Sequence, residues 1–110
     1  MSGYQQFQIR HYLTPDGRDL YEEWRETLDR PVADRIDAYV TRMASGNFGV
    51  SRSIGGGIQE LKIDFGPGYR VYYLRDEGQL VVLLCGGDKQ DQPADISMAK
   101  RLGVDYWRRK

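Results

Sequence analysis

The stretch that decides the fold is residues 60–89, which read ELKIDFGPGYRVYYLRDEGQLVVLLCGGDK. Apolar and polar residues alternate over residues 60–65 and again over 69–74, the pattern of strands that present two different faces. The turn signals GPG and DEG follow these two segments. Residues 80–85 are apolar on both faces, which is typical of a central strand covered on both sides. This stretch therefore predicts three strands in an antiparallel meander.

One strand and two helices are predicted before the meander. Residues 4–13 alternate and predict a strand. Apolar residues at every fourth position over 18–28 predict a helix, and a second stripe over 32–43 predicts another. Pro31 precedes this second stripe and suits a first helical turn. Because only a few residues connect the two helices, we expect an antiparallel helix hairpin.

The remaining segments complete a single domain. The five glycines of residues 46–57 indicate a loop or a bent strand. Gln92 and Pro93 open a last helix, which Gly103 is expected to end, so residues 104–110 would form a short tail. The order is strand, helix, helix, three strands and helix, which is an α+β architecture. Since compact domains hold about 100–150 residues, we expect one domain over residues 1–110.

Composition narrows the function classes. The chain holds 16 Lys and Arg against 16 Asp and Glu, so a net charge of zero gives no global attraction to nucleic acid or membrane. The sequence contains neither a long apolar run nor a signal peptide, so we expect a cytoplasmic protein with no membrane partner. The charge is nevertheless uneven, because eight acids lie in residues 16–37 and five bases in residues 100–110.

A single histidine and a single cysteine exclude several familiar sites. The usual zinc site needs three or four close ligands, so we expect no metal, and no other cofactor is indicated. Cys85 lies in an apolar strand and is expected to be a core residue. His11 has no second histidine for the acid–base pair of many ribonucleases, so a structural role is favoured. The glycines of residues 55–57 lack the Lys and Ser/Thr of a phosphate-binding loop and are interpreted as a bend.

The polar face of the meander carries the candidate chemistry. If Leu61 and Val71 face the core, Lys62, Arg70 and Tyr72 share the opposite face, and the turn brings Lys62 near Arg70. Cations beside a Tyr can hold phosphates and stack a base. An Arg can stabilise a pentavalent phosphate, and a Lys beside other cations can act as a base. The alternative is a solvated face with surface ion pairs, which the residues by themselves favour.

The chain resembles the HigB-like branch of the RelE/ParE toxin superfamily, often called addiction-module killer proteins. The resemblance spans nearly the whole chain and rests on the ordered segments GNFG (46–49), ELKI (60–63), GPGYRVYY (66–73) and LLCGGDK (83–89), followed by Gln92 and Asp95-Ile96. It implies a RelE/ParE-like fold and the toxin of a type II toxin–antitoxin system.

The resemblance also implies an activity. RelE- and HigB-type members are metal-independent endoribonucleases that cleave mRNA in the ribosomal A site and inhibit translation. In them the 2′-hydroxyl attacks the adjacent phosphate, and basic residues replace the usual histidines. For this chain it implies Arg70 as phosphate and transition-state binder, Lys62 as base or electrostatic partner, and Lys89 as a second phosphate contact. The substrate-binding candidates are Tyr72, Arg52, Asp88 and Gln92.

Two departures from the nuclease pattern keep alternatives open. Nuclease members often carry an Arg just after this Lys and a Tyr several residues later, where this chain has Gln90 and then Asp95. A ParE-like toxin that binds a protein target such as gyrase is one alternative, and a non-catalytic antitoxin-binding module is another.

The implied partners are a cognate antitoxin and the ribosome with its mRNA. The antitoxin is expected to be a helix-turn-helix protein from a neighbouring gene, and DNA is contacted only through it. The acidic helices and the basic tail are both candidate antitoxin surfaces.

Overall fold

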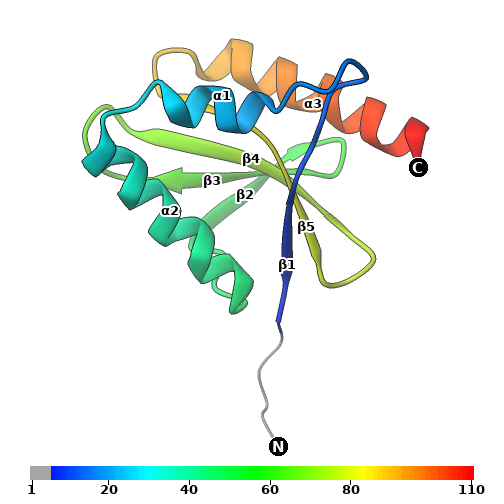
Figure 1. Cartoon of the computed structure of the whole chain (residues 1–110), viewed down its shortest axis with the longest axis horizontal. Helices are drawn as coiled ribbons and strands as arrows, with labels where there is room; N and C mark the ends of the chain where they lie inside the picture. The colour runs from blue at the N-terminus through cyan, green and yellow to red at the C-terminus, as the bar shows by residue number, and fades with distance from the viewer. Residues whose placement is uncertain (1–5) are drawn as a thin grey trace, which may run out of the picture.

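A five-stranded sheet forms the centre of the molecule. The computed structural model of the chain describes residues 6–110 (Figure 1). The strands are β1 (Gln8–His11), β2 (Val50–Gly55), β3 (Ile58–Ile63), β4 (Tyr69–Asp76) and β5 (Leu80–Asp88). In space they follow the order β1-β5-β4-β3-β2. β1 runs parallel to β5, whereas the other neighbours are antiparallel. The sheet is therefore mixed, within an α+β fold.

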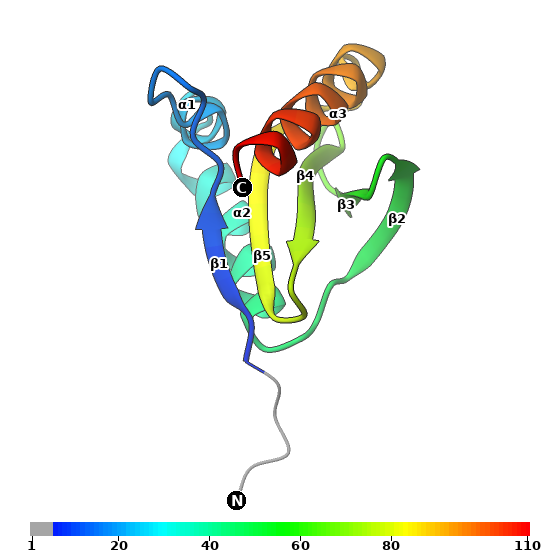
Figure 2. The same cartoon turned by 90° about the vertical axis from the view of Figure 1, so that its right-hand side faces the viewer.

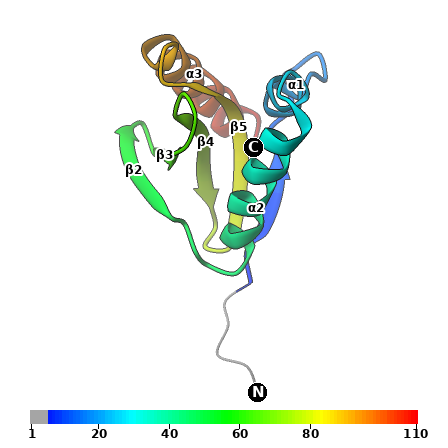
Figure 3. The same cartoon turned by 90° about the vertical axis from the view of Figure 1, so that its left-hand side faces the viewer.

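Helices cover both faces of this sheet. α1 (Leu20–Glu26) and α2 (Arg30–Ala44) lie on one face, and α3 (Gln92–Arg109) lies across the other (Figures 2 and 3). β5 has a strand on either side and helices above and below, which confirms the doubly covered central strand predicted from residues 80–85. Within residues 6–110 no helix is long and apolar enough to cross a membrane.

Two apolar clusters, one beneath each helical layer, make up the core. The first contains Phe7, Tyr21, Ile36, Met43, Leu61, Ile63, Val71, Tyr73, Val81 and Leu83. The second contains Tyr12, Ile58, Tyr72, Leu74, Val82, Leu84, Cys85, Ala99 and Leu102. Successive side chains of β4 point into the two clusters in turn. The face expected to be exposed to solvent is therefore largely covered by α3, and Cys85 is a core residue whose burial raises its pKa to about 12.

An ion pair joins the two helices of the first layer. The guanidinium of Arg25 donates to both carboxylate oxygens of Asp37, at 2.6 and 2.5 Å. In Figure 1 α1 and α2 run back from their short connection and diverge as an open V, whereas the expected antiparallel hairpin would have kept them alongside each other. Each helix uses its apolar stripe against the sheet, through Trp24 and Leu28 in one case and Ile36 and Met43 in the other.

The meander has four strands rather than the three expected, because residues 50–55 form β2. Of the two alternatives for this glycine-rich segment, the bent strand is confirmed. Its register with β3 shifts between Ser53 and Gly55. Gly55, Gly56 and Gly57 have φ angles of 95°, 65° and 78°, a left-handed run that glycine adopts readily and that turns the chain into β3.

The position of the first strand was not predicted. Of the expected strand over residues 4–13, residues 8–11 form β1, and residues 4 and 5 lie outside the described part of the chain. β1 pairs with β5, which is about seventy residues away in the sequence. Periodicity predicts that a segment is a strand, but it carries no information about which distant strand becomes its neighbour.

The last helix does not end at Gly103. It continues to Arg109, so the expected tail of residues 104–110 is almost entirely helical. Gly103 is buried, and a Cβ placed there would lie 2.5 Å from Cδ1 of Ile58. The glycine therefore allows α3 to approach the sheet closely, a packing role that the sequence pattern does not distinguish from a helix stop.

Candidate functional site

A cavity opens where β2, β3 and β4 meet the start of α3. Its volume is about 360 Å³. The lining residues are Val50, Arg52, Glu60, Lys62, Arg70 and Gln92. The strand pairing brings these residues together. Lys62 of β3 lies opposite Arg70 of β4, and Glu60 of β3 lies opposite Arg52 of β2. The cavity thus brings together four residues that were predicted from the sequence, namely Arg52, Lys62, Arg70 and Gln92.

Arg70 is the unusual residue of this cavity. Only 6% of it is exposed, and its Nη1 donates to the carbonyl oxygen of Gly68 at 2.8 Å. Its buried Nε has no hydrogen-bond partner, and no carboxylate in residues 6–110 forms an ion pair with it. A buried charge without a partner is costly, so this guanidinium is suited to receive an anion that enters the cavity.

The turn before β4 holds Arg70 in place. Gly68 has a φ of 80°, and a Cβ there would lie 3.0 Å from Nη1 of Arg70 and 3.7 Å from Cβ of Lys89. A side chain at this position would therefore strain the backbone and press on the guanidinium. Lys89 does not line the cavity, but it lies beside the turn that carries Arg70.

Lys62 supplies the second positive charge at the cavity. It is exposed, lies directly across from Arg70 on the neighbouring strand, and forms no ion pair with any of residues 6–110. Val50 lies opposite Lys62 on the other side and is 70% exposed, so this end of the cavity is open to solvent. The cavity therefore presents one buried and one exposed cation next to each other.

Glu60 organises the other side of the cavity and was not among the residues predicted from the sequence. Its carboxylate, only 3% exposed, accepts hydrogen bonds from Nε of Arg52 at 2.8 Å, Nε2 of Gln92 at 2.8 Å and the hydroxyl of Tyr72 at 2.9 Å. Burial acts to raise the pKa of Glu60, but these hydrogen bonds outweigh burial and hold the pKa below its usual value.

The alternation of residues suggests that Glu60 forms a surface ion pair with Lys62, but Glu60 is buried. It pairs with Arg52 instead, because those two residues are direct neighbours across β2 and β3. Only the cross-strand register shows this pairing, and β2 itself is one of two alternatives at the level of sequence. The signal available in the sequence was Glu60 two residues before Lys62, which places both on one face of the strand.

Tyr72 and Asp88 do not line the cavity. Tyr72 is fully buried beneath Glu60, so it has no exposed ring face on which a base could stack. Burial, followed by the hydrogen bond to Glu60, raises the pKa of Tyr72 well above its usual value. A carboxylate oxygen of Asp88 accepts the backbone N–H of Asp91 at 3.3 Å, in the connection that leads into α3.

Asp95, in the first turn of α3, is a half-buried acid on this face. It lies over Gly87, the cross-strand neighbour of Arg70, where its Oδ2 would be 1.9 Å from a Cβ. That oxygen is buried without a hydrogen-bond partner. Burial, with Asp91 and Asp88 nearby, raises the pKa of Asp95 to about 6. The carboxyl does not line the cavity, but it changes its charge near neutral pH one strand away from Arg70.

Comparison with known proteins gives two matches. A family model described as "Phage derived protein Gp49-like (DUF891)" matches residues 23–102, a range that contains every residue of the cavity. A protein of Haemophilus influenzae, described as uncharacterized, is 47% identical to this chain over 86 residues. The alignment covers 77% of this chain and 87% of that protein.

Proposed function

Because this chain belongs to the family of Gp49-like phage-derived proteins, we propose that it is a type II toxin that cleaves mRNA on the ribosome without a metal. The family suggests the toxin of a toxin–antitoxin pair and implies a cognate antitoxin. The nuclease activity, the inhibition of translation and the closer relation to the HigB-like branch of RelE/ParE toxins are our proposals. The proposed place of action is the cytoplasm, with DNA contacted only through the antitoxin.

The observation that carries the proposal is the buried, unpaired guanidinium of Arg70 in a cavity beside Lys62. A phosphodiester is an anion of matching chemistry, because its two free oxygens can accept hydrogen bonds from an arginine guanidinium. Lys62 adds a mobile ammonium group on the open side. The local positive charge makes RNA binding compatible with a net charge of zero.

The proposed reaction is a transesterification within the RNA. The 2′-hydroxyl oxygen bonds to the adjacent phosphorus while the bond from phosphorus to the 5′-oxygen breaks. Lys62 accepts the hydroxyl proton, or water accepts it while Lys62 neutralises the developing charge, and Arg70 stabilises the pentavalent phosphate. The 5′-oxygen leaves with a proton from water. The products are a 2′,3′-cyclic phosphate and a 5′-hydroxyl end.

The neighbouring residues have supporting roles in this proposal. Arg52 and Gln92 contact the nucleotides on either side, and their common hydrogen-bond acceptor Glu60 holds both at the cavity wall. Lys89, beside the turn of Gly68, provides a second phosphate contact outside the cavity. Preorganised donors of this kind stabilise a transition state without reorganising during the reaction.

The test is inducible expression of the full chain with growth and transcript ends recorded together. We expect growth arrest and new 5′-hydroxyl ends in ribosome-bound mRNA. Arg70→Ala should restore growth and reduce cleavage at least ~100-fold, the usual loss when a transition-state donor is removed. Arg75→Ala is the matched control, because Arg75 lies on the same strand but is exposed and packs over Phe7 and Phe48.

Other outcomes of this experiment would replace the proposal. Growth arrest with intact mRNA and damaged DNA would favour a toxin that binds a protein target such as gyrase, which the neutral net charge also suits. Full expression with no growth defect would favour a non-catalytic antitoxin-binding module. Equal toxicity of the Arg70→Ala and Arg75→Ala variants would move the active site elsewhere.

A further inference from the structure

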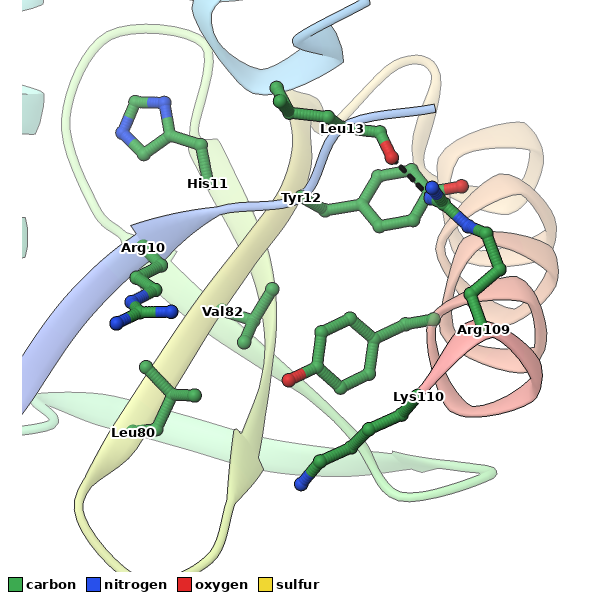
Figure 4. A pocket seen from close by; sticks show the side chains of 9 residues that line it. Arg10, His11, Tyr12, Leu13, Leu80, Val82, Arg109 and Lys110 are labelled. Atoms are coloured by element: carbon green, nitrogen blue, oxygen red, sulfur yellow. Dashed lines mark hydrogen bonds between the residues drawn. The ribbon is translucent and has the colours of Figure 1, made fainter. Parts of the chain in front are cut away.

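A second cavity lies at the other end of α3, between the last turn of that helix and the strands β1 and β5 (Figure 4). Its volume is about 290 Å³. Its lining includes the apolar side chains of Leu80 and Val82 and two tyrosines, Tyr12 and Tyr106. It is lined by none of the residues of the cavity around Arg70. We call it the β1 cavity.

One wall of the β1 cavity is held by Asp105. Its carboxylate accepts the hydroxyl of Tyr12 at 2.5 Å and Nε of Arg109 at 2.8 Å. Arg109 also donates to the carbonyl oxygen of Leu13, the bond drawn in Figure 4. Tyr12 is only 3% exposed, so this wall is fixed by buried as well as surface contacts.

The opposite wall is held by Asp76, which is 1% exposed. Its carboxylate accepts the hydroxyl of Tyr106 at 2.5 Å and Nζ of Lys110 at 2.7 Å. Both walls are thus held by carboxylates that accept hydrogen bonds from within the chain. A preformed cavity binds with a smaller loss of conformational entropy than one that must be ordered.

The rim carries a positive charge that nothing else in the structure uses. The side chain of Arg10 is exposed and forms no hydrogen bond or ion pair within the described range, residues 6–110. Arg109 and Lys110 line the same rim, but Asp105 and Asp76 pair with them, so the uncompensated positive charge of the rim comes from Arg10. The rim therefore favours a negatively charged partner, whereas the apolar wall of Leu80 and Val82 favours an apolar group of that partner.

The backbone beside this cavity is an open sheet edge. β1 is the outermost strand, and the N–H groups of Gln8 and Tyr12 donate inward to β5, each at 2.8 Å, to the carbonyls of Gln79 and Leu83. Since hydrogen-bonding direction alternates along a strand, the N–H groups of Ile9 and His11 point to the outer edge. An unpaired edge of this kind accepts an added strand.

We propose that an extended acidic segment of the antitoxin adds to the outer edge of β1 and anchors in the β1 cavity. The added strand pairs with the backbone of Ile9 and His11. Its side chains on the α3 face place a carboxylate beside Arg10 and an apolar group against the cavity wall. A protein segment fits better than RNA, because only a peptide supplies the alternating N–H and C=O groups that pair with a strand.

This inference rests on the proposed function, because it takes the antitoxin as the partner. It assigns an antitoxin-binding surface, for which the sequence offers two candidates, the acidic helices and the basic tail. The tail contributes Arg109 and Lys110, but the decisive groups belong to β1.

The test uses a backbone change and its matched control. His11→Pro removes the outward N–H and leaves the inward bonds of Gln8 and Tyr12 intact, since proline is tolerated where an edge strand faces solvent. His11→Ala loses the same side chain, including the bond to Asp19, but keeps the N–H. Arg10→Glu reverses the rim charge on an exposed side chain and does not depend on the tolerance of proline.

The full chain and each variant are purified and titrated calorimetrically with the small protein encoded by the neighbouring gene. We expect His11→Pro and Arg10→Glu each to weaken binding at least ~10-fold relative to His11→Ala. Binding unchanged by both variants, or no binding by the wild-type chain, overturns the docking proposal. The docking proposal is also overturned if Arg10→Glu weakens binding to a twelve-nucleotide oligouridine but leaves binding to the small protein unchanged.

Growth without the neighbouring gene separates this inference from the proposed function. Arg10→Glu should arrest growth as strongly as the wild type when expressed alone, and should resist rescue by the neighbouring gene. If the wild-type chain alone has no effect on growth, the proposed function fails, while the calorimetric comparison of His11→Pro with His11→Ala still decides the docking site.

Discussion

The buried charge near the start of α3 lacks an ion-pair partner among the described residues, whereas the buried charge near its end is paired. At the start of α3, Arg70 is buried with an unpartnered Nε, and no carboxylate among residues 6–110 forms an ion pair with it. At its end, the buried carboxylate of Asp76 has both Tyr106 and Lys110 as partners. A satisfied network stabilises the scaffold, whereas an unsatisfied buried cation lowers stability and is retained where it binds something. The comparison therefore separates the proposed reaction site from the proposed docking site.

The largest expected effect comes from replacing Arg70 with an apolar residue of similar length. Arg70→Met should abolish growth arrest and reduce mRNA cleavage at least ~100-fold. The melting temperature should stay the same or rise, because an unpaired buried charge is removed. A marked fall in melting temperature would show that Arg70 stabilises the fold, and would contradict the contrast with the paired charge of Asp76.

Glu60 should show a mixed effect, since it belongs to the reaction site but is fully partnered. Glu60→Gln weakens the hydrogen bonds that hold Arg52 and Gln92, so we expect a loss of about 1–3 kcal/mol in the free energy of unfolding. Cleavage should fall roughly 10-fold because both side chains lose their fixed position. Glu26→Gln, at an exposed glutamate without an ion pair, is the control in denaturant titrations.

Asp95 should make the stability of the folded chain depend on pH. Its pKa is raised to about 6 in the folded chain, so the folded state disfavours ionisation and loses stability as pH rises from about 4 through 6. Asp95→Asn should therefore stabilise the chain by about 1–3 kcal/mol at pH 8 and have little effect below pH 4. Thermal melts of both proteins across pH 3–8 measure this, and an equal difference at all pH values would contradict it.

Asp76 should give the smallest effect and the opposite pH dependence. Its hydrogen bonds from Lys110 and Tyr106 hold its pKa below the usual value, so its contribution is present near neutral pH and lost as pH falls through the lowered pKa. Asp76→Asn should lower the melting temperature by several degrees at pH 7 and leave toxicity unchanged. A loss of toxicity at full stability would instead link this end of α3 to the reaction.

Much of the fold follows from local patterns in the sequence. The alternation around the GPG turn predicts the pairing of Lys62 with Arg70, and the apolar run of residues 80–85 predicts a central strand; both are observed. The glycines proved harder to interpret. Gly103 has the appearance of a helix stop, but it is the contact point of α3 with Ile58, because a missing side chain serves either purpose.

The periodicity of the sequence predicts the strands β1, β3, β4 and β5, the presence of the three helices and the pairing of Lys62 with Arg70 on one sheet face, while β2 is only one of two alternatives. Only the tertiary structure decided that α3 covers this face, that Glu60 is buried among three donors and that Arg70 is left without a carboxylate. It also decided that β1 forms an edge beside the β1 cavity. The reason is physical: periodicity is a property of neighbours in the chain, whereas burial and charge pairing depend on segments that meet only after folding.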